Sequence, residues 1–179
     1  MLKVAIVGNI ASGKSTVENI LETKGFKVFD TDKISHKILE SSKEVKEVFG
    51  TTNRVELAKI VFSDNQKLKT LESIIHPKVK QELEKIFLMN YNLVFVSVPQ
   101  LFESGFDILF DKIIYITADE NVRLNRLIKR NSYTLEEAQK RINAQEEGQK
   151  REKADFIIEN NSDFSNLESQ VEKILSILV

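Results

Sequence analysis

The chain has 179 residues, of which 41% are hydrophobic and 30% charged, and its formal net charge is −1. This composition predicts one domain with a substantial core, and the balanced charge argues against a general binder of polyanions. The chain has no cysteine, which excludes disulfides, thiolate zinc sites and cysteine nucleophiles. No apolar run approaches the ~20 residues of a membrane span, and the first residues enter a strand rather than a signal sequence. We therefore expect a soluble, cytoplasmic protein.

Four or five short β-type runs alternate with helical stretches, which predicts a parallel sheet with helices on both faces. The strands are expected at Leu2–Val7, Lys27–Phe29, Leu93–Val98, Lys112–Thr117 and Phe156–Ile158. The run Leu93–Val98 is almost entirely apolar, as expected for a strand covered on both faces. The chain shows no internal repeat and no linker. A single α/β domain over residues 1–179 is therefore predicted.

Apolar residues spaced three or four apart predict the helices. These are expected at Thr16–Lys24, Asp32–Glu40, Asn65–Leu88 and, near the C-terminus, Leu167–Leu178. Pro77 interrupts the long segment that begins at Asn65, because a proline inside a helix removes a hydrogen bond and clashes with the preceding turn. We therefore predict two helices there, the second beginning near His76 and Pro77.

Two excursions from the sheet are rich in polar residues. The first covers about residues 41–88 and is mostly helical; the second covers about residues 121–153. The second holds nine basic and five acidic residues, a local charge of +4 from nine minus five. They are Arg123, Arg126, Lys129, Arg130, Lys140, Arg141, Lys150, Arg151 and Lys153, against Glu136, Glu137, Glu146, Glu147 and Glu152. A solvated helix face explains most of them, but a flap beside a phosphate site would use a few of the arginines to close on a transition state.

The segment Gly8–Ser15 matches the phosphate-loop pattern G-x-x-x-x-G-K-[ST] and directly follows the apolar run Val4–Val7. Its glycines let backbone N–H groups converge on phosphate oxygens, and the helix that follows directs its positive end at the same anion. Lys14 can reach the β- and γ-phosphates, and the Ser15 hydroxyl can ligate Mg²⁺. The alternative is a chance turn, but a strand and a helix flank the motif as nucleotide binding requires. The residues predicted to bind a nucleoside triphosphate are Gly8, Asn9, Ile10, Ala11, Ser12, Gly13, Lys14, Ser15 and Thr16.

Two aspartates, Asp30 and Asp32, follow the second predicted strand. Open α/β sheets bind ligands at the carboxyl ends of their strands, so we expect this pair to face the phosphate loop. A carboxylate there can accept a proton from an attacking hydroxyl. Asp32 can equally be the N-cap of a helix that begins at Lys33, and both interpretations stay open. The chain lacks the N-K-x-D motif of GTPases, and it has no aspartate after Val98 of the kind that secures Mg²⁺ in many ATPases.

Further segments, in the right order across almost the whole chain, resemble the dephospho-CoA kinase family. The matching segments are Gly8–Val17, Gly25–Ile34, Val61–Phe62, Leu71–Val79, Pro99–Glu103, Arg141 with Gln145, and Ala154–Asn160. A phosphate loop alone is shared by many proteins. Its combination with His76-Pro77, Pro99–Glu103 and Ala154–Asn160 is specific to this family.

The resemblance implies a P-loop kinase-like three-layer sandwich, with about residues 41–88 as a helical acceptor-binding subdomain and about residues 121–153 as a lid. It implies transfer of the γ-phosphoryl group of ATP to the ribose 3′-hydroxyl of dephospho-CoA, the last step of CoA biosynthesis, with Mg²⁺. Asp32 would be the general base. Arg130 and Arg141 are the candidates to neutralise the transferred group, because a planar guanidinium suits spread phosphoryl charge.

The resemblance also assigns contacts to side chains that have structural alternatives. The acceptor would contact Asp30, Asp32, His76, Pro99, Leu101, Phe102 and Glu103, and the adenine would lie near Asn160. Without the resemblance, His76 is a histidine at the start of a helix, Leu101 and Phe102 are apolar residues after a core strand, and Asn160 is a turn residue.

Asn9 and Ala11 depart from the family pattern, which usually has glycine at both positions, and Ala11 then needs a φ that a non-glycine residue tolerates. Two alternatives remain: a P-loop kinase for another small hydroxyl or nucleotide acceptor, and a non-catalytic nucleotide-dependent switch. The expected partners are the small molecules ATP and dephospho-CoA, with no nucleic acid, no membrane and no obligate protein partner.

Overall fold

The computed structural model describes residues 1–145 and 147–179 and divides them into two compact units. The first unit comprises Met1–Phe29 and Tyr91–Val179, and the second comprises Asp30–Asn90. Glu146, one of the five acidic residues counted in the second excursion, lies outside the described residues.

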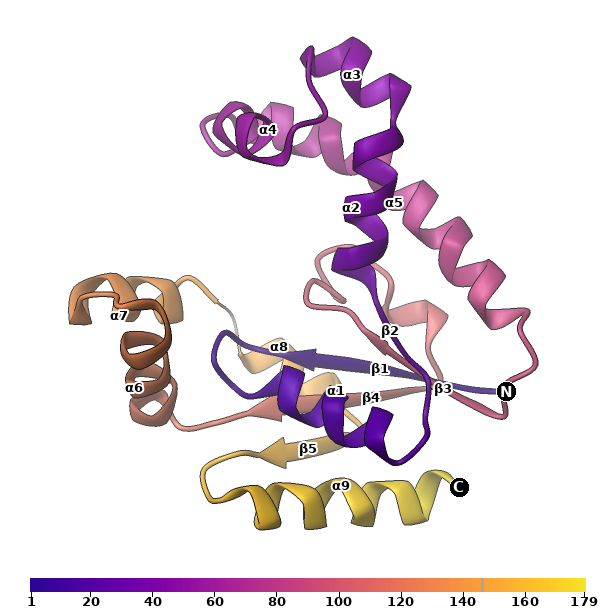
Figure 1. Ribbon diagram of the computed structural model, residues 1–179, viewed down its shortest axis with the longest axis vertical. Helices are drawn as coiled ribbons and strands as arrows, with labels where there is room; N and C mark the ends of the chain where they lie inside the picture. The colour runs from indigo at the N-terminus through magenta and orange to yellow at the C-terminus, as the bar shows by residue number, and fades with distance from the viewer. Residues whose placement is uncertain (146) are drawn as a thin grey trace. The chain divides into compact units, whose positions relative to one another are not determined.

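The first unit is built on a five-stranded sheet with the strand order β2-β3-β1-β4-β5 (Figure 1). The strands are β1 (Leu2–Gly8), β2 (Val28–Asp30), β3 (Leu93–Ser97), β4 (Lys112–Thr117) and β5 (Phe156–Glu159). β1 pairs in parallel with β3 and β4, and β4 pairs in parallel with β5. The predicted α/β fold with a parallel sheet is therefore confirmed, and each strand ends within one residue of its predicted bounds.

The central position of β1 explains its unbroken apolar run. Because β1 lies between β3 and β4, both of its faces are covered, and Val4 through Val7 are fully buried. On one face the strands pack against α1 (Lys14–Thr23) and α9 (Phe164–Leu178). The helices contribute to this core the buried side chains of Val17, Ile20, Leu21, Leu167, Val171, Ile174 and Leu175.

Three helices of the first unit come from the predicted lid segment. They are α6 (Glu120–Asn131), α7 (Leu135–Asn143) and α8 (Gly148–Lys153). Helix α8 packs against β4, on the opposite side of the sheet from α1 (Figure 1). Helices α6 and α7 form a small apolar core around Leu127, Ala138 and Ile142, against which Ile10 and Ala11 of the phosphate loop also pack.

The second unit is helical. Its helices are α2 (Thr31–Ser41), α3 (Lys43–Phe49), α4 (Arg54–Val61) and α5 (Asn65–Phe87). The prediction of two helices separated at Pro77 is wrong, because α5 runs through the proline as one helix of 23 residues. Buried residues lie on both sides of Pro77, including Ile74, Ile75, Val79 and Leu83, and α5 packs against α2, α3 and α4. Packing of this continuous stripe outweighs the hydrogen bond that the proline removes.

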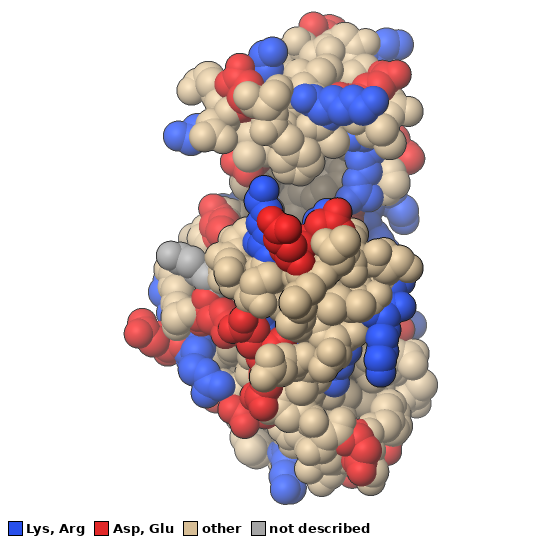
Figure 2. All heavy atoms as spheres, turned by 90° about the vertical axis from the view of Figure 1, so that its left-hand side faces the viewer, with Lys and Arg blue, Asp and Glu red and all other residues tan. Residues whose placement is uncertain are grey.

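Acidic and basic side chains are interspersed among the described residues on the face shown in Figure 2. This distribution agrees with the nearly balanced net charge of −1. Within residues 1–145 and 147–179, no helix combines the length and the apolar character needed to cross a bilayer.

Candidate active site

The phosphate loop connects β1 to α1 and has two residues with a left-handed backbone, Ala11 with φ 59° and Gly13 with φ 95°. The Ser12 N–H donates to the Asn9 carbonyl oxygen at 3.1 Å and closes the turn. A Cβ at Gly13 would lie 2.0 Å from the side-chain nitrogen of Asn160, so packing as well as φ requires glycine there. Ala11 adopts the conformation that the family pattern normally gives to glycine, at a cost of about 1 kcal/mol.

Lys14 begins helix α1 and directs its ammonium toward the end of β3. Lys14 Nζ donates to Glu18 Oε1 at 2.7 Å and to Ser97 Oγ at 2.5 Å. Ser15 is exposed in the first turn of the same helix. Ser97 was not among the predicted site residues; the available signal was a hydroxyl in a strand that is otherwise apolar.

Arg126 and Asn160 hold the phosphate loop from the side of α6 and β5. Asn160 Nδ2 donates to the Ser12 carbonyl oxygen at 2.8 Å. Arg126 Nη1 donates to the Ala11 carbonyl oxygen at 3.2 Å, and its Nη2 donates to the Asn160 carbonyl oxygen at 2.9 Å. Burial lowers the pKa of Arg126 from its ordinary value. Both side chains therefore fix carbonyls of the loop, and neither bonds one of its N–H groups.

Asn160 is buried, so the interpretation of it as a plain turn residue is wrong. Its predicted position near adenine stays a prediction. Arg126 was counted among the basic residues but not identified as part of the site. Arginines at three- and four-residue spacing give no sign of which one faces the loop, because that depends on how α6 docks.

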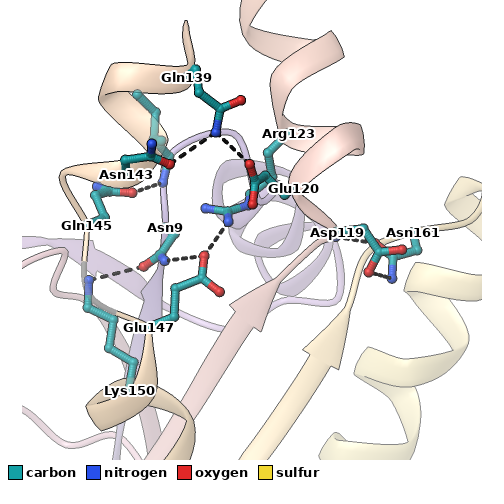
Figure 3. Close-up of polar contacts among 11 residues, drawn as sticks. Asn9, Asp119, Glu120, Arg123, Gln139, Asn143, Gln145, Glu147, Lys150 and Asn161 are labelled. Carbon is teal, nitrogen blue, oxygen red and sulfur yellow. Dashed lines mark hydrogen bonds and ion pairs between the residues drawn. The ribbon is translucent and has the colours of Figure 1, made fainter.

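A second set of polar side chains contacts the start of the phosphate loop (Figure 3). Asn9 Nδ2 donates to Glu147 Oε1 at 3.0 Å, and Lys150 Nζ donates to Asn9 Oδ1 at 3.1 Å. The Ile10 N–H donates to Gln145 Oε1 at 2.7 Å. Arg123 on α6 in turn pairs with Glu147. Only 3% of Arg123 and 5% of Lys150 is exposed, so the expectation of a solvated face is wrong for these two lid residues.

The loop can accept Mg²⁺ together with a triphosphate. Magnesium in such sites binds through phosphates, waters and only one or two protein oxygens. The exposed Ser15 hydroxyl can provide one of these oxygens. Among the described residues no cluster of three His, Cys, Asp or Glu side chains forms a metal cage.

Comparison with known proteins decides the family. The sequence model of the dephospho-CoA kinase family matches residues 2–166. The chain belongs to the dephospho-CoA kinase family. The dephospho-CoA kinase of Fusobacterium nucleatum subsp. nucleatum is 40% identical over 183 residues, which cover 95% of this chain and 95% of that protein.

Two solved structures extend the similarity to the fold. The crystal structure of TT1252 from Thermus thermophilus has a TM-score of 0.87 and 33% identity, and covers 99% of this chain and 98% of that chain. The dephospho-CoA kinase from Campylobacter jejuni has a TM-score of 0.75 and 32% identity, and covers 97% of this chain and 95% of that chain. The resemblance read from the motifs is therefore confirmed.

The two arginines proposed for the lid of this dephospho-CoA kinase family member lie at the surface of the first unit. Arg130 is exposed near the end of α6, where its Nε donates to Asn131 Oδ1 at 3.0 Å. Arg141 is exposed on α7, and its guanidinium lies 4.5 Å from the centre of the Tyr133 ring. Their role at the γ-phosphoryl group stays a prediction.

The turn after β3 carries four residues that the resemblance assigns to the acceptor. Leu101 is fully buried, so its contribution in this structure is packing. Pro99 and Phe102 are half-buried, and the Phe102 ring lies 5.0 Å from Lys153 Nζ. Glu103 is exposed, with its Oε1 3.8 Å from Lys150 Nζ.

The remaining predicted residues lie in the second unit. Asp30 is the N-cap of α2, because its carboxylate accepts from the N–H groups of Asp32 at 2.8 Å and Lys33 at 3.4 Å. The interpretation of Asp32 as the cap is therefore wrong, and Asp32 is exposed in the first turn of α2. His76 is half-buried in the interior of α5, not at the start of a helix as its structural alternative required.

Proposed function

We propose that this chain transfers the γ-phosphoryl group of ATP to the ribose 3′-hydroxyl of dephospho-CoA, giving CoA and ADP. The observation that carries the proposal is family membership over nearly the whole chain, with the family model matching residues 2–166. The phosphate loop supports it independently, because a buried strand, the loop and a helix follow one another as a triphosphate site requires. We assign the reaction to the cytoplasm, a reducing compartment with which a chain without cysteine is compatible.

On the donor side, the loop N–H groups and the positive end of α1 bind the phosphates. Lys14 stabilises the negative charge on the β- and γ-phosphates, and the Ser15 hydroxyl holds the metal. When bound, Mg²⁺ neutralises charge on the transferred group. Arg126 and Asn160 keep the loop in the shape that binds, through their hydrogen bonds to its carbonyls.

On the acceptor side, the oxygen of the ribose 3′-hydroxyl attacks the γ-phosphorus, and Asp32 takes the proton of that hydroxyl. The bond from the γ-phosphorus to the bridging oxygen breaks at the same time, and ADP leaves with that electron pair. Arg130 and Arg141 offset the charge of the transferred group. The acceptor is held by about residues 41–88, with contacts from Asp30, His76, Pro99, Phe102 and Glu103, and residues 121–153 act as the lid.

An acceptor screen tests this proposal. The purified protein is incubated with ATP and Mg²⁺ together with dephospho-CoA, shikimate or a nucleoside monophosphate, and ADP and the phosphorylated product are measured. We expect turnover with dephospho-CoA alone, and loss of turnover when EDTA removes the metal. A Lys14→Met preparation, purified in the same way, controls for a host kinase carried through purification. Turnover with another acceptor but not with dephospho-CoA would contradict the proposal.

A further inference from the structure

Asn9 is buried within the phosphate loop and bonded on both sides of its amide. It is 3% exposed, donates to Glu147 Oε1 at 3.0 Å and accepts from Lys150 Nζ at 3.1 Å. An amide presents a donor and an acceptor at one carbon, so it fits between a carboxylate and an ammonium in one orientation only. The glycine that the family pattern usually has at this position offers neither group.

The two partners of Asn9 are themselves held in place. Glu147 pairs with Arg123 on α6, and Lys150 lies 3.8 Å from Glu103 in the turn after β3. These five side chains form a row of alternating charge from α6 to the turn after β3, with the neutral amide at its centre (Figure 3 shows all but Glu103). Lys150 is 5% exposed, so its ammonium depends on the Asn9 oxygen to offset lost solvation.

Further contacts fasten the same part of the loop to the lid segment. Gln145, Glu147 and Lys150 lie between the end of α7 and the middle of α8, and we call these three residues the return limb. The Ile10 N–H donates to Gln145, next to the bonds of Asn9. The side chains of Ile10 and Ala11 pack against the core that α6 and α7 share. The start of the phosphate loop is therefore held by the segment that is proposed to close over the nucleotide.

We propose that Asn9 is a positioning residue for nucleotide binding, which couples the return limb of the lid to the phosphate loop through Glu147 and Lys150. Asn9 acts through the loop backbone, not on the reacting atoms. When its amide is bonded, the loop is ordered before the phosphates arrive, and binding does not have to order it. The inference rests on the proposed function, because it concerns the binding of the same nucleotide.

The test exchanges donor and acceptor in the hydrogen bond between Asn9 and Glu147. Asn9→Asp keeps the acceptor for Lys150 but places a second carboxylate against Glu147. In the double variant Asn9→Asp/Glu147→Gln, the two carboxylates no longer face each other. The amide at position 147 can turn its nitrogen to donate to the carboxylate at position 9 and use its oxygen to accept from Arg123. Asn9→Asp/Glu120→Gln has the same net charge and is the matched control. Glu120 lines the same cavity of about 390 Å³ as Glu147, and it bonds Gln139.

We measure the dissociation constants of ATP and ADP by calorimetry, kcat and KM for ATP, and the melting temperature. Wild-type binding is established first, because its absence would count against the proposed function and not against the coupling. We expect Asn9→Asp to weaken ATP binding about tenfold with a smaller change in kcat. The Glu147→Gln double variant should recover most of the affinity, and the Glu120→Gln double variant should not.

Three results would overturn the inference. The first is unchanged nucleotide affinity in Asn9→Asp, including the case in which only the melting temperature falls, since Asn9 would then serve stability alone. The second is recovery by Glu120→Gln as large as by Glu147→Gln, which would make the effect one of net charge. The third is no recovery in either double variant.

Discussion

Asp30 and Asp32 are two residues apart, and the structure gives them different roles. Asp30 ends β2 and caps α2 with its carboxylate, whereas Asp32 lies exposed in the first turn of that helix. A sequence pattern cannot separate these roles, because aspartate is favoured both as a cap and in the first turn of a helix. Since Asp30 is the cap, a substitution at Asp32 tests its proposed chemistry without removing the cap.

Asp32→Asn should reduce kcat by at least about a hundredfold, because an amide cannot accept the proton of the acceptor hydroxyl. The dissociation constant of ATP should change little, because Asp32 is proposed to act on the acceptor hydroxyl and not on the phosphates of ATP. Asp64→Asn is the matched control, since Asp64 caps α5 of the same unit and loses the same charge. If Asp32→Asn lowered ATP affinity as much as turnover, the role of general base would have to be abandoned.

Gly13 has a left-handed backbone and a side chain close to the place of a Cβ. Gly25 also has a left-handed backbone, but nothing lies close to the place of its Cβ. Their φ values are 95° and 88°, but an added Cβ meets the Asn160 nitrogen at 2.0 Å only at Gly13 and meets nothing within 4 Å at Gly25. Gly13→Ala should therefore lose measurable ATP binding, while Gly25→Ala should bind ATP normally and lose about 1 kcal/mol of stability from backbone strain. Calorimetry and urea unfolding of both variants check this. Equal loss of binding in both would show that φ alone matters.

At the scale of an element, α5 shows how tertiary packing overrides a local signal. Pro77 predicts a break, yet the helix continues from Asn65 to Phe87. The apolar spacing on both sides of the proline was visible in the sequence. The sequence did not show how strongly this apolar spacing stabilises the helix. An apolar stripe stabilises a helix only if another element covers it, and here α2, α3 and α4 do so.

Pro77→Ala should stabilise the protein. The alanine restores a backbone donor and removes the clash with the preceding turn, worth about 3 kcal/mol in a helix interior. It also loses the restriction that proline places on the unfolded chain, about 1 kcal/mol. We expect a net gain of about 2 kcal/mol in the free energy of unfolding, measured in urea. A loss of stability would mean that the helix depends on a bend at the proline.

At the scale of the whole molecule, the chain divides its proposed tasks between two units. The phosphate loop, the lid segment and Asn160 belong to the first unit, and Asp32 and His76 belong to the second, Asp30–Asn90. The predicted acceptor-binding subdomain, about residues 41–88, falls within the second unit. Its role there is part of the proposal.

Hydrogen exchange measured by mass spectrometry can test this division. ATP should slow exchange in Gly8–Ser15 and around Asn160, because binding orders those amides. Dephospho-CoA should slow exchange within residues 30–90. Shikimate is the control and should slow neither. Protection by dephospho-CoA confined to the first unit would contradict the assignment of the acceptor to the helical unit.

The sequence alone determined the five strands, the phosphate loop and the family. Strands buried on both faces are continuous apolar runs, and a phosphate loop is a local backbone shape that its own glycines permit, so both are readable without knowledge of the neighbours. Tertiary structure decided which basic residues of the lid segment are buried, which aspartate caps α2, and whether α5 continues through Pro77. It also brought Asn9 to Glu147 and Lys150, residues that are 138 and 141 positions away. These outcomes depend on which face of an element meets another element, and contacts between distant segments exist only once the chain has folded.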